Sequence, residues 1–282
     1  MTTFLIVGCG YLGRHVCQYL DHPNHQVFYL KRSDPTSKDH GKHIQKDWFK
    51  CTTNDIPEVD YVFYTMSPNS MRDADYQRNY TDGTQHLVKL MKQQKALKKI
   101  IFVSSTSVYD VHDGRWVYED DKDFSQTPKA QAILQAESIL TQSDLPHIIA
   151  RLGGIYGHGR HYLMDLIRQG KYYLNHKQVF SNRIHVEDAA RCLHHLAQIP
   201  ESHTIFHGTD PQPTALNTIT AWLSSKLGAT IEYSMSEDEA SRSRLTNKRI
   251  SSEKLVASGF HFQYPSFREG FIQIMKQERM ID

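Results

Sequence analysis

The sequence has no long hydrophobic run. No apolar stretch among its 282 residues approaches the roughly 20 residues that a membrane-spanning helix needs. The N-terminus also lacks the charged segment and apolar core of a secretory signal peptide. We therefore expect a soluble protein with no membrane partner.

Cysteine is scarce, with 4 residues at unrelated spacings. Such spacings match neither a disulfide framework nor a zinc-binding motif, and free thiols are typical of a reducing compartment. The 17 histidines likewise provide no set of ligands at a usable spacing. The sequence therefore predicts a cytoplasmic location and no metal site.

An excess of charge of one sign is missing as well. The 33 Lys and Arg residues nearly balance the 31 Asp and Glu residues. A chain without a net field has no long-range attraction to nucleic acid or to anionic lipid. We expect a small-molecule substrate and no nucleic-acid partner.

The strongest positive signal lies near the N-terminus. Residues 3–7 form an apolar run typical of a parallel strand covered on both faces, and a Gly-x-Gly-x-x-Gly turn and a helical pattern follow. In this context Gly8 makes the tight turn, Gly10 lets the backbone approach a pyrophosphate, and Gly13 lets helix and strand pack closely. The alternative is a tight turn that binds nothing. The cofactor-binding residues expected here are Gly8, Gly10, Tyr11, Leu12 and Gly13.

The residues after the second strand, predicted over 25–30, bear on the choice of cofactor. An acid there would bind the ribose 2′-hydroxyl of NAD, but the chain has Lys31 and Arg32. Cations suit a 2′-phosphate, because a guanidinium can bind phosphate through two hydrogen bonds. The sequence therefore favours NADP. NAD is the alternative, because Lys31 and Arg32 can also belong to a solvated turn in which Asp34 serves the ribose.

Two further strand ends add residues to the same site, since ligands bind at the carboxyl ends of parallel strands. The strands are predicted over 44–46 and 61–65. The cofactor-binding residues that follow them are Asp47, Trp48, Met66, Ser67 and Pro68.

Strands alternate with helical patterns along the chain. This order predicts an α/β fold, a Rossmann-type doubly wound parallel sheet with a smaller α+β substrate lobe toward the C-terminus. We expect residues 1–154 to form the dinucleotide-binding domain, completed by 183–209. Residues 155–182 and 210–282 would form the substrate-binding lobe, in which the polar segment 234–248 is expected to be a mobile flap or a solvated turn.

Several motifs together carry a resemblance to a known family. They are the N-terminal glycine motif and the segments Asn79–Thr84, Ser104–Tyr109, Arg151–Gly157 and Asn182–Asp188. In this order and at this spacing, the chain resembles the extended short-chain dehydrogenase/reductases, the NAD-dependent epimerase/dehydratase group. The resemblance covers nearly the whole chain and implies the same fold, a dinucleotide cofactor and a homodimer.

That family places a hydroxyl at the end of the fifth strand and a Tyr-x-x-x-Lys pair on the next helix, where the lysine lowers the pKa of the phenol. By resemblance, Ser105 holds the hydroxyl position. Aligning Glu137 with the acid that follows the pair puts Lys129 in place of the tyrosine and Ile133 in place of the lysine. Both catalytic residues are absent, so the chain resembles the atypical members of the superfamily.

Tyr109 is a candidate substitute for the missing phenol. It follows Ser105 on the same loop, and Lys129 at the start of the helix would supply an ammonium group. We therefore predict Ser105 and Tyr109 as the catalytic residues. The alternative is that Tyr109 packs under the loop and Lys129 lies in solvent.

The resemblance also implies residues beyond the sixth strand. Those expected to line the nicotinamide are Leu152, Gly153 and Ile155. Those expected to meet the substrate are Arg160, His161 and Arg183. Arg160 suits an anionic group or, alternatively, a salt bridge that closes its loop. Sugar-nucleotide epimerases carry an arginine for the diphosphate where this chain has Ser181, which disfavours a nucleotide-sugar substrate.

These features favour an enzyme, namely an NADP-preferring oxidoreductase or epimerase-like protein that acts on a small polar molecule. The intact glycine motif and the full substrate lobe support this hypothesis. The competing hypothesis is a catalytically inactive NAD(P)-binding regulator or redox sensor, which the loss of the Tyr and Lys pair favours.

Overall fold

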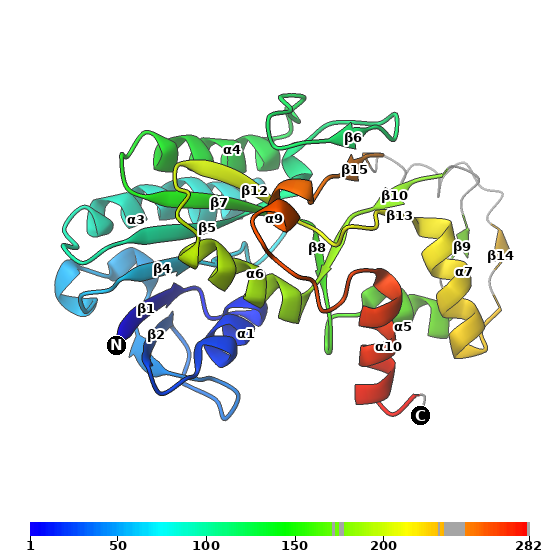
Figure 1. Cartoon of the computed structure of the whole chain (residues 1–282), viewed down its shortest axis with the longest axis horizontal. Helices are drawn as coiled ribbons and strands as arrows, with labels where there is room; N and C mark the ends of the chain where they lie inside the picture. Colours follow the sequence, from blue (N-terminus) through cyan, green and yellow to red (C-terminus); the bar gives the residue numbers. More distant parts are fainter. Residues whose placement is uncertain (171–172, 175–177, 231, 234–245, 281–282) are drawn as a thin grey trace. The chain divides into compact units, whose positions relative to one another are not determined.

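The structure is a computed structural model, and it describes residues 1–170, 173–174, 178–230, 232–233 and 246–280 (Figure 1). The polar segment 234–248, expected to be a mobile flap or a solvated turn, therefore lies outside the described residues as far as residue 245. Among the described residues, no helix is both long enough and apolar enough to cross a membrane.

The chain forms two compact units. The first unit comprises residues 1–108, 124–151 and 189–206. The second unit takes its described residues from 109–123, 152–188 and 207–282. The segment 109–123 thus belongs with the second unit, although it lies inside the range expected for the dinucleotide-binding domain. The domain boundaries expected from the sequence stay predictions.

A central sheet organises the first unit. Within the described residues it has seven strands in the order β12-β7-β5-β4-β1-β2-β3 (Figure 1). The strands are β1 (Thr2–Val7), β2 (His25–Lys31), β3 (Lys42–Gln45), β4 (Tyr61–Tyr64), β5 (Lys99–Ser105), β7 (His147–Leu152) and β12 (Thr204–Gly208). β1 pairs in parallel with β2 and with β4, so that Val7 lies opposite both Leu30 and Tyr64. The expected Rossmann-type α/β fold is confirmed.

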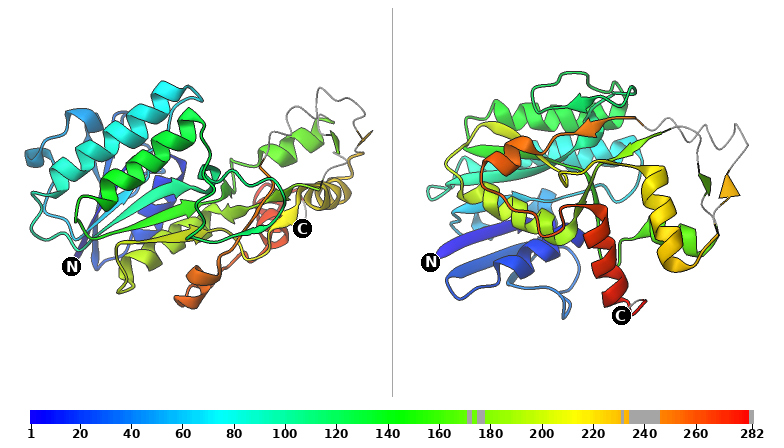
Figure 2. Two further views of the ribbon diagram at one scale, coloured as in Figure 1. Left: turned by 90° about the horizontal axis from the view of Figure 1, so that it is seen from above. Right: turned by 45° about the vertical axis from the view of Figure 1, so that its right-hand side comes forward.

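The helices of the first unit pack on its sheet and bury the strands, which explains why the strands are apolar. They are α1 (Tyr11–Leu20), α2 (Asp73–Tyr76), a π-helical turn (Gln77–Asp82), α3 (Gly83–Met91), α4 (Pro128–Thr141) and α6 (Val186–Gln198). α3 and α4 pack side by side along one face of the sheet (Figures 1 and 2). α1 meets α6 where the rings of Tyr19 and His194 lie 5.4 Å apart. Residues 5–7 of β1 are consequently fully buried.

The order of strands changes direction beside β1. β2 and β3 follow it on one side, whereas β4 and β5 lie on the other. In open α/β sheets, ligands bind outside the carboxyl ends of the strands at such a switch point. The turn from Gly8 to Gly13 follows β1 at this point, so the fold places it where a nucleotide is expected.

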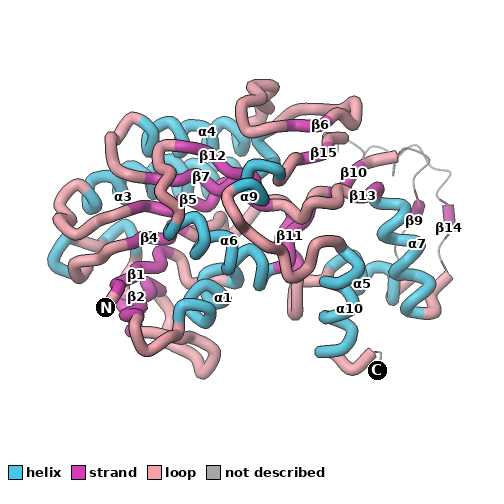
Figure 3. The backbone as a smooth tube through the Cα atoms, viewed as in Figure 1, coloured by secondary structure: helices cyan, strands magenta, loops and turns pink. Residues whose placement is uncertain are grey.

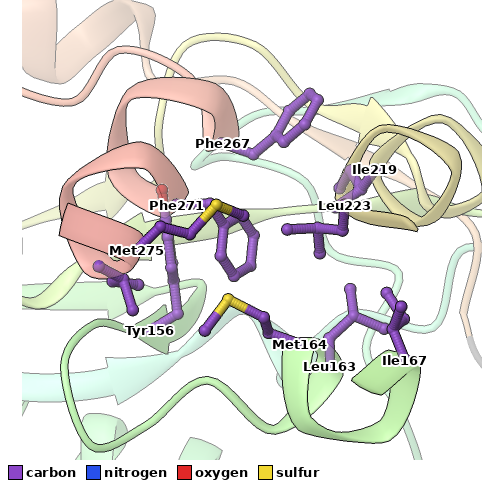
Figure 4. Packing of buried hydrophobic residues seen from close by; sticks show 10 residues of the cluster. Tyr156, Leu163, Met164, Ile167, Ile219, Leu223, Phe267, Phe271 and Met275 are labelled. Atoms are coloured by element: carbon purple, nitrogen blue, oxygen red, sulfur yellow. The ribbon is translucent and has the colours of Figure 1, made fainter. Parts of the chain in front are cut away.

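The second unit has its own core. Its helices are α5 (Tyr162–Arg168), α7 (Leu216–Leu227), α9 (Glu253–Ala257) and α10 (Phe267–Gln277). Met164, Leu223 and Phe271 converge from α5, α7 and α10 within one apolar cluster (Figure 4). Short strand pairs complete the unit (Figure 3): β6 (Trp116–Val117) with β15 (Arg249–Ile250), β8 (Gly154–Tyr156) with β11 (Arg183–His185), β9 (Tyr173–Leu174) with β14 (Glu232–Tyr233), and β10 (Phe180–Ser181) with β13 (Thr214–Ala215).

Candidate dinucleotide site

Two glycines of the turn after β1 are required by the protein's own packing. Gly8 has a φ of +97°, and an added Cβ would lie 2.7 Å from the backbone nitrogen of Met66. An added Cβ at Gly13 would lie 2.5 Å from the carbonyl oxygen of Gly8. Both contacts are too short for real atoms, so the turn can form only with glycine at these two positions.

Gly10 is different, because no described part of the protein demands a glycine there. Its φ is −85°, which any residue can adopt, and an added Cβ would meet no atom of the described residues within 4 Å. Gly10 also precedes α1 without any side-chain cap, which leaves the first N–H groups of the helix to other partners. Open space in front of a helix N-terminus is the geometry that accepts a phosphate.

A cavity of about 620 Å³ opens at this turn within the first unit. Its volume falls in the range of small-molecule and cofactor sites, which is roughly 300–1,000 Å³. The residues predicted from the sequence that line it are Gly8, Gly10, Lys31, Arg32, Asp47, Trp48, Met66 and Ser67. The lining also includes Cys9, Leu30, Ser33, Phe49, Thr65, Asn69, Asp75, Arg78 and Asn79.

The other predicted cofactor residues do not line this cavity. Tyr11 lies at the start of α1 with its ring 5.0 Å from that of His15, and Leu12 is buried. Gly13 packs against Gly8, and Pro68 is not among the lining residues. The three residues expected at the nicotinamide belong to the second unit: Leu152, Gly153 and Ile155.

Lys31 and Arg32 differ in their surroundings. Lys31 Nζ lies 2.8 Å from Asp39 Oδ2, and Arg14 Nε lies 2.9 Å from Oδ1 of the same carboxylate. Thr36 donates two more hydrogen bonds to it, from its backbone nitrogen and its hydroxyl. Burial alone would raise the pKa of Asp39, but these hydrogen bonds outweigh it and hold that pKa well below its ordinary value. In the part of the chain that the structure describes, no hydrogen bond or ion pair holds the exposed guanidinium of Arg32.

Trp48 and Asp47 have separate roles at the edge of the cavity. The Trp48 side chain is buried in the core, where its Nε1 donates a hydrogen bond to the carbonyl oxygen of Gly83 at 3.1 Å. Asp47 caps the next turn by accepting a hydrogen bond from the nitrogen of Phe49. The Arg78 guanidinium lies 4.5 Å from the centre of the Phe49 ring and 3.9 Å from Asp47. Asp47 and Arg78 therefore bring a carboxylate and a stacked cation to the cavity, whereas the indole nitrogen of Trp48 is engaged with Gly83.

The end of β5 brings Ser105 to the first unit's strand ends. Its hydroxyl accepts a hydrogen bond from the nitrogen of Ser107 at 3.1 Å, and the residue is half-buried. On α4, Ile133 is buried in the core, with 1% of its surface exposed. Lys129 Nζ lies 5.8 Å from the centre of the Tyr76 ring. No phenol from α4 stands beside Ser105, as the sequence predicts.

Tyr109 lies in the second unit and is fully buried. Its hydroxyl shares a hydrogen bond of 2.8 Å with His207 Nε2, and His207 Nδ1 lies 3.1 Å from the carbonyl oxygen of Ser251. The nearby Lys248 is also buried, and its Nζ donates to the carbonyl oxygen of Tyr109 at 2.7 Å. Tyr109 is thus part of a closed internal network, and its predicted catalytic role stays a prediction.

The residues predicted for the substrate lie in the second unit. His161 Nε2 is 2.5 Å from a carboxylate oxygen of Glu278, and Arg160 is exposed on the preceding turn. Arg183 begins β11, and its carbonyl oxygen accepts a hydrogen bond from the nitrogen of Asp210. Burial raises the pKa of Asp210 to about 8, despite the lowering effects of the Gln212 nitrogen and the Arg183 charge. Among the described residues, no group of three or more His, Cys, Asp or Glu side chains is placed to hold a metal ion.

Four residues of this region were missed by reasoning from the sequence: Arg14, Asp39, Phe49 and Arg78. Arg14 follows Gly13 directly, but nothing in the sequence indicates that its side chain pairs with a loop 25 residues away. Asp39 lies in a polar loop that carries no recognisable motif. Phe49 and Arg78 meet only because α2 and its π-helical turn lie beside the residues that follow β3.

The parallel seven-stranded sheet and its glycine turn define a Rossmann-type α/β protein. The profile of the NAD dependent epimerase/dehydratase family matches residues 4–207. The chain belongs to this family, which confirms the resemblance noted in the sequence. A search of curated proteins found no match.

Solved structures show the same fold at low sequence identity. A protein of Methylobacillus flagellatus, named as an NAD-dependent epimerase/dehydratase, is 23% identical, with a TM-score of 0.80 and 99% of each chain covered. The human epimerase family protein SDR39U1, solved with NADPH, is 16% identical, with a TM-score of 0.80 over 98% of this chain and 99% of that one. UDP-glucuronic acid 4-epimerase from Bacillus cereus, solved with NAD, is 17% identical, with a TM-score of 0.80 and the same coverage.

Proposed function

We propose that this chain is an NAD(P)-dependent oxidoreductase or epimerase-like enzyme that prefers NADP and acts on a small polar molecule in the cytoplasm. Gly10 carries the proposal. It is a glycine that the fold does not require, next to an uncapped helix N-terminus and a cavity large enough for a cofactor. By analogy with the family, we also propose that the enzyme is a homodimer.

The residues present fit a dinucleotide. Gly10 and the start of α1 would hold the pyrophosphate. Asp47 and the stacked pair of Phe49 and Arg78 would border the adenine end, and Arg32 would meet a 2′-phosphate. Relatives of this fold have been solved with NADPH and with NAD, which supports a nicotinamide dinucleotide of either kind.

Ser105 is the catalytic residue in this proposal. A bound nicotinamide would supply or accept a hydride at a substrate carbon. The half-buried Ser105 hydroxyl would orient the substrate oxygen through a hydrogen bond. Tyr109 is fully buried and engaged with His207, so we limit its role to holding that network together.

Thermal denaturation with added nucleotide tests the proposal. A ligand that binds the folded state raises the melting temperature, and at 100 times its Kd the gain is about 2.7 kcal/mol. We expect NADPH to raise the melting temperature more than NADH does at equal concentration. The reverse order would contradict the NADP preference. No shift with either nucleotide would contradict dinucleotide binding itself.

A redox sensor is the second candidate, because one thiol lines the cavity and a second, buried thiol lies next to it. Cys9 lines the cavity, and its Sγ is 4.0 Å from that of Cys17. The hydrogen bond with Cys17 lowers the pKa of Cys9, which favours its thiolate. Hydrogen peroxide would oxidise the two thiols to one disulfide while it is reduced to two molecules of water.

This second candidate has its own test. A sensor should lose its nucleotide-induced thermal shift after peroxide treatment and regain it with a dithiol reductant. Cys17→Ser should form no disulfide with Cys9 and should keep its thermal shift after peroxide, whereas Cys51→Ser should behave like the unmodified protein because Cys51 is not part of the Cys9–Cys17 pair. A shift that peroxide leaves unchanged would exclude the sensor.

A further inference from the structure

We propose that Asp39 determines how strongly the site discriminates NADPH from NADH, by occupying Lys31 and Arg14 and leaving Arg32 to recognise the 2′-phosphate. This inference rests on the proposed function. It assigns the selectivity to a residue in a loop that no sequence motif marks.

The carboxylate of Asp39 is closed off from solvent. Its side chain is 0% exposed, whereas those of Lys31 and Arg14 are 13% and 37% exposed. It accepts hydrogen bonds from both cations and two from Thr36, so its lone pairs are committed within the protein. These hydrogen bonds favour the ionised carboxylate and hold the pKa of Asp39 well below its ordinary value.

The charge balance follows from these contacts. Arg14, Lys31 and Arg32 contribute three positive charges, and Asp39 removes one of them from the strand end. Lys31 has one of its three donors on Asp39, and its largely buried position keeps the ammonium near that carboxylate. A phosphate that approached Lys31 would also approach Asp39, and the like charges would repel.

Arg32 has no such competitor. It lines the cavity and is exposed, and no ion pair within the described part of the chain holds it. Its planar guanidinium can donate two hydrogen bonds to one phosphate. The sequence assigns the 2′-phosphate to Lys31 and Arg32 equally, but the ion pairs assign it mainly to Arg32.

Substitution of Asp39 separates this role from that of a simple structural anchor. Asp39→Asn keeps the shape of the side chain but removes the negative charge, so Lys31 and Arg14 become available to the ligand. We expect the Kd of NADPH to fall about tenfold, and that of NADH to change less than about threefold, because NADH lacks the 2′-phosphate. Titration of the intrinsic nicotinamide fluorescence measures both constants.

The matched control is Asp21→Asn. Asp21 is 62% exposed and pairs with His40, the neighbour of Asp39, so this change alters the net charge equally without touching Lys31 or Arg14. We expect it to change the ratio of the two Kd values less than about twofold, since exposed charges are screened. A ratio that Asp39→Asn leaves unchanged, shifts toward NADH, or shifts no more than the control does would overturn the inference.

A second pair of variants tests whether Arg32 rather than Lys31 recognises the 2′-phosphate, even if Asp39→Asn does not fold. Lys31→Met removes a cation that the proposal treats as already occupied, so the NADPH Kd should rise less than about threefold. Arg32→Gln should raise it about tenfold or more and should leave NADH nearly unaffected. An equal rise of the NADPH Kd in the two variants would overturn the assignment of the 2′-phosphate to Arg32. If the unmodified protein bound neither nucleotide, the proposed function would be contradicted together with this inference. That result differs from nucleotide binding in which Asp39→Asn leaves the ratio of the two Kd values unchanged, which would contradict this inference alone.

Discussion

Arg151 binds Glu137 through two contacts, from Nε to Oε1 at 3.0 Å and from Nη2 to Oε2 at 2.5 Å. Both side chains are buried, and Ser104 donates a further hydrogen bond to Oε1 at 2.5 Å. Glu137 lies on α4, the helix that carries the Tyr and Lys pair in the family. The helix is therefore anchored by its acid although the catalytic residues that precede this acid are missing.

Breaking this ion pair should destabilise the protein strongly. Arg151→Met leaves the Glu137 carboxylate buried without its cation, which typically costs about 3–5 kcal/mol. Urea denaturation of the nucleotide-free protein measures the loss. The control is Arg72→Met, since Arg72 is 78% exposed and its pair with Asp75 should be worth less than about 1 kcal/mol. Equal decreases in the free energy of unfolding of the two variants would show that the buried ion pair stabilises the protein no more than the exposed pair does.

Gly10 and Gly13 should respond to substitution in opposite ways. Gly10→Val should abolish the thermal shift caused by NADPH while changing the melting temperature of the free protein little, because the open space accepts a side chain. Gly13→Ala should lower the melting temperature of the free protein itself, because its Cβ would lie 2.5 Å from the Gly8 oxygen. Retention of the NADPH shift by Gly10→Val would refute the pyrophosphate site.

Removal of the Ser105 hydroxyl should slow turnover without affecting cofactor binding. A positioned hydroxyl that assists proton transfer contributes a factor of about 10²–10⁴. We expect Ser105→Ala to lower NADPH oxidation against a panel of small carbonyl compounds, with an unchanged Kd for NADPH. Ser107→Ala is the matched control, because Ser107 contacts Ser105 through its backbone nitrogen. Equal activity in all three proteins would leave Ser105 without a catalytic role.

Tyr109→Phe should affect stability rather than catalysis. The change deprives the buried His207 Nε2 of its partner at 2.8 Å, and an unsatisfied buried group costs about 1–3 kcal/mol. Chemical denaturation measures this loss. Tyr118→Phe provides a comparison, because the Tyr118 side chain is exposed. If Tyr109→Phe retained full stability and lost turnover instead, Tyr109 would be the proton donor and our restriction of its role would be wrong.

Asp210 makes stability depend on pH. Because its pKa in the folded state is raised to about 8, the folded protein keeps a proton there that the unfolded chain releases above about pH 4. Stability from this group is present at pH 4 and is lost as the pH rises to 8. Asp210→Asn cannot titrate, so its melting temperature relative to the unmodified protein should rise across this interval. A constant difference would contradict the raised pKa.

The fold was predictable because its signals are local. The apolar run of β1 and the spacing of Gly8, Gly10 and Gly13 reflect contacts within one strand, one turn and one helix. Strand ends of a parallel sheet meet at one edge, so Asp47 and Met66 could be assigned to the same cavity without knowledge of any distance.

The pairings within the site were not predictable. Lys31 looked like a free cation because its partner Asp39 is in a loop of no fixed pattern. The strand end predicts Trp48 as a cofactor-binding residue, but only the structure shows its indole nitrogen on the carbonyl of Gly83. Residue type and strand position indicate where a side chain starts, whereas its direction depends on packing between distant segments.

The interleaving of the two units has a consequence for how the chain folds during synthesis. β12, at one edge of the central sheet, consists of Thr204–Gly208, so the sheet cannot close until about three quarters of the chain has left the ribosome. Until then β7 is an open edge with unpaired backbone groups, the kind of edge that recruits other chains. A chain truncated after residue 154 would keep that edge permanently, and we expect it to aggregate rather than to fold as an isolated nucleotide-binding domain.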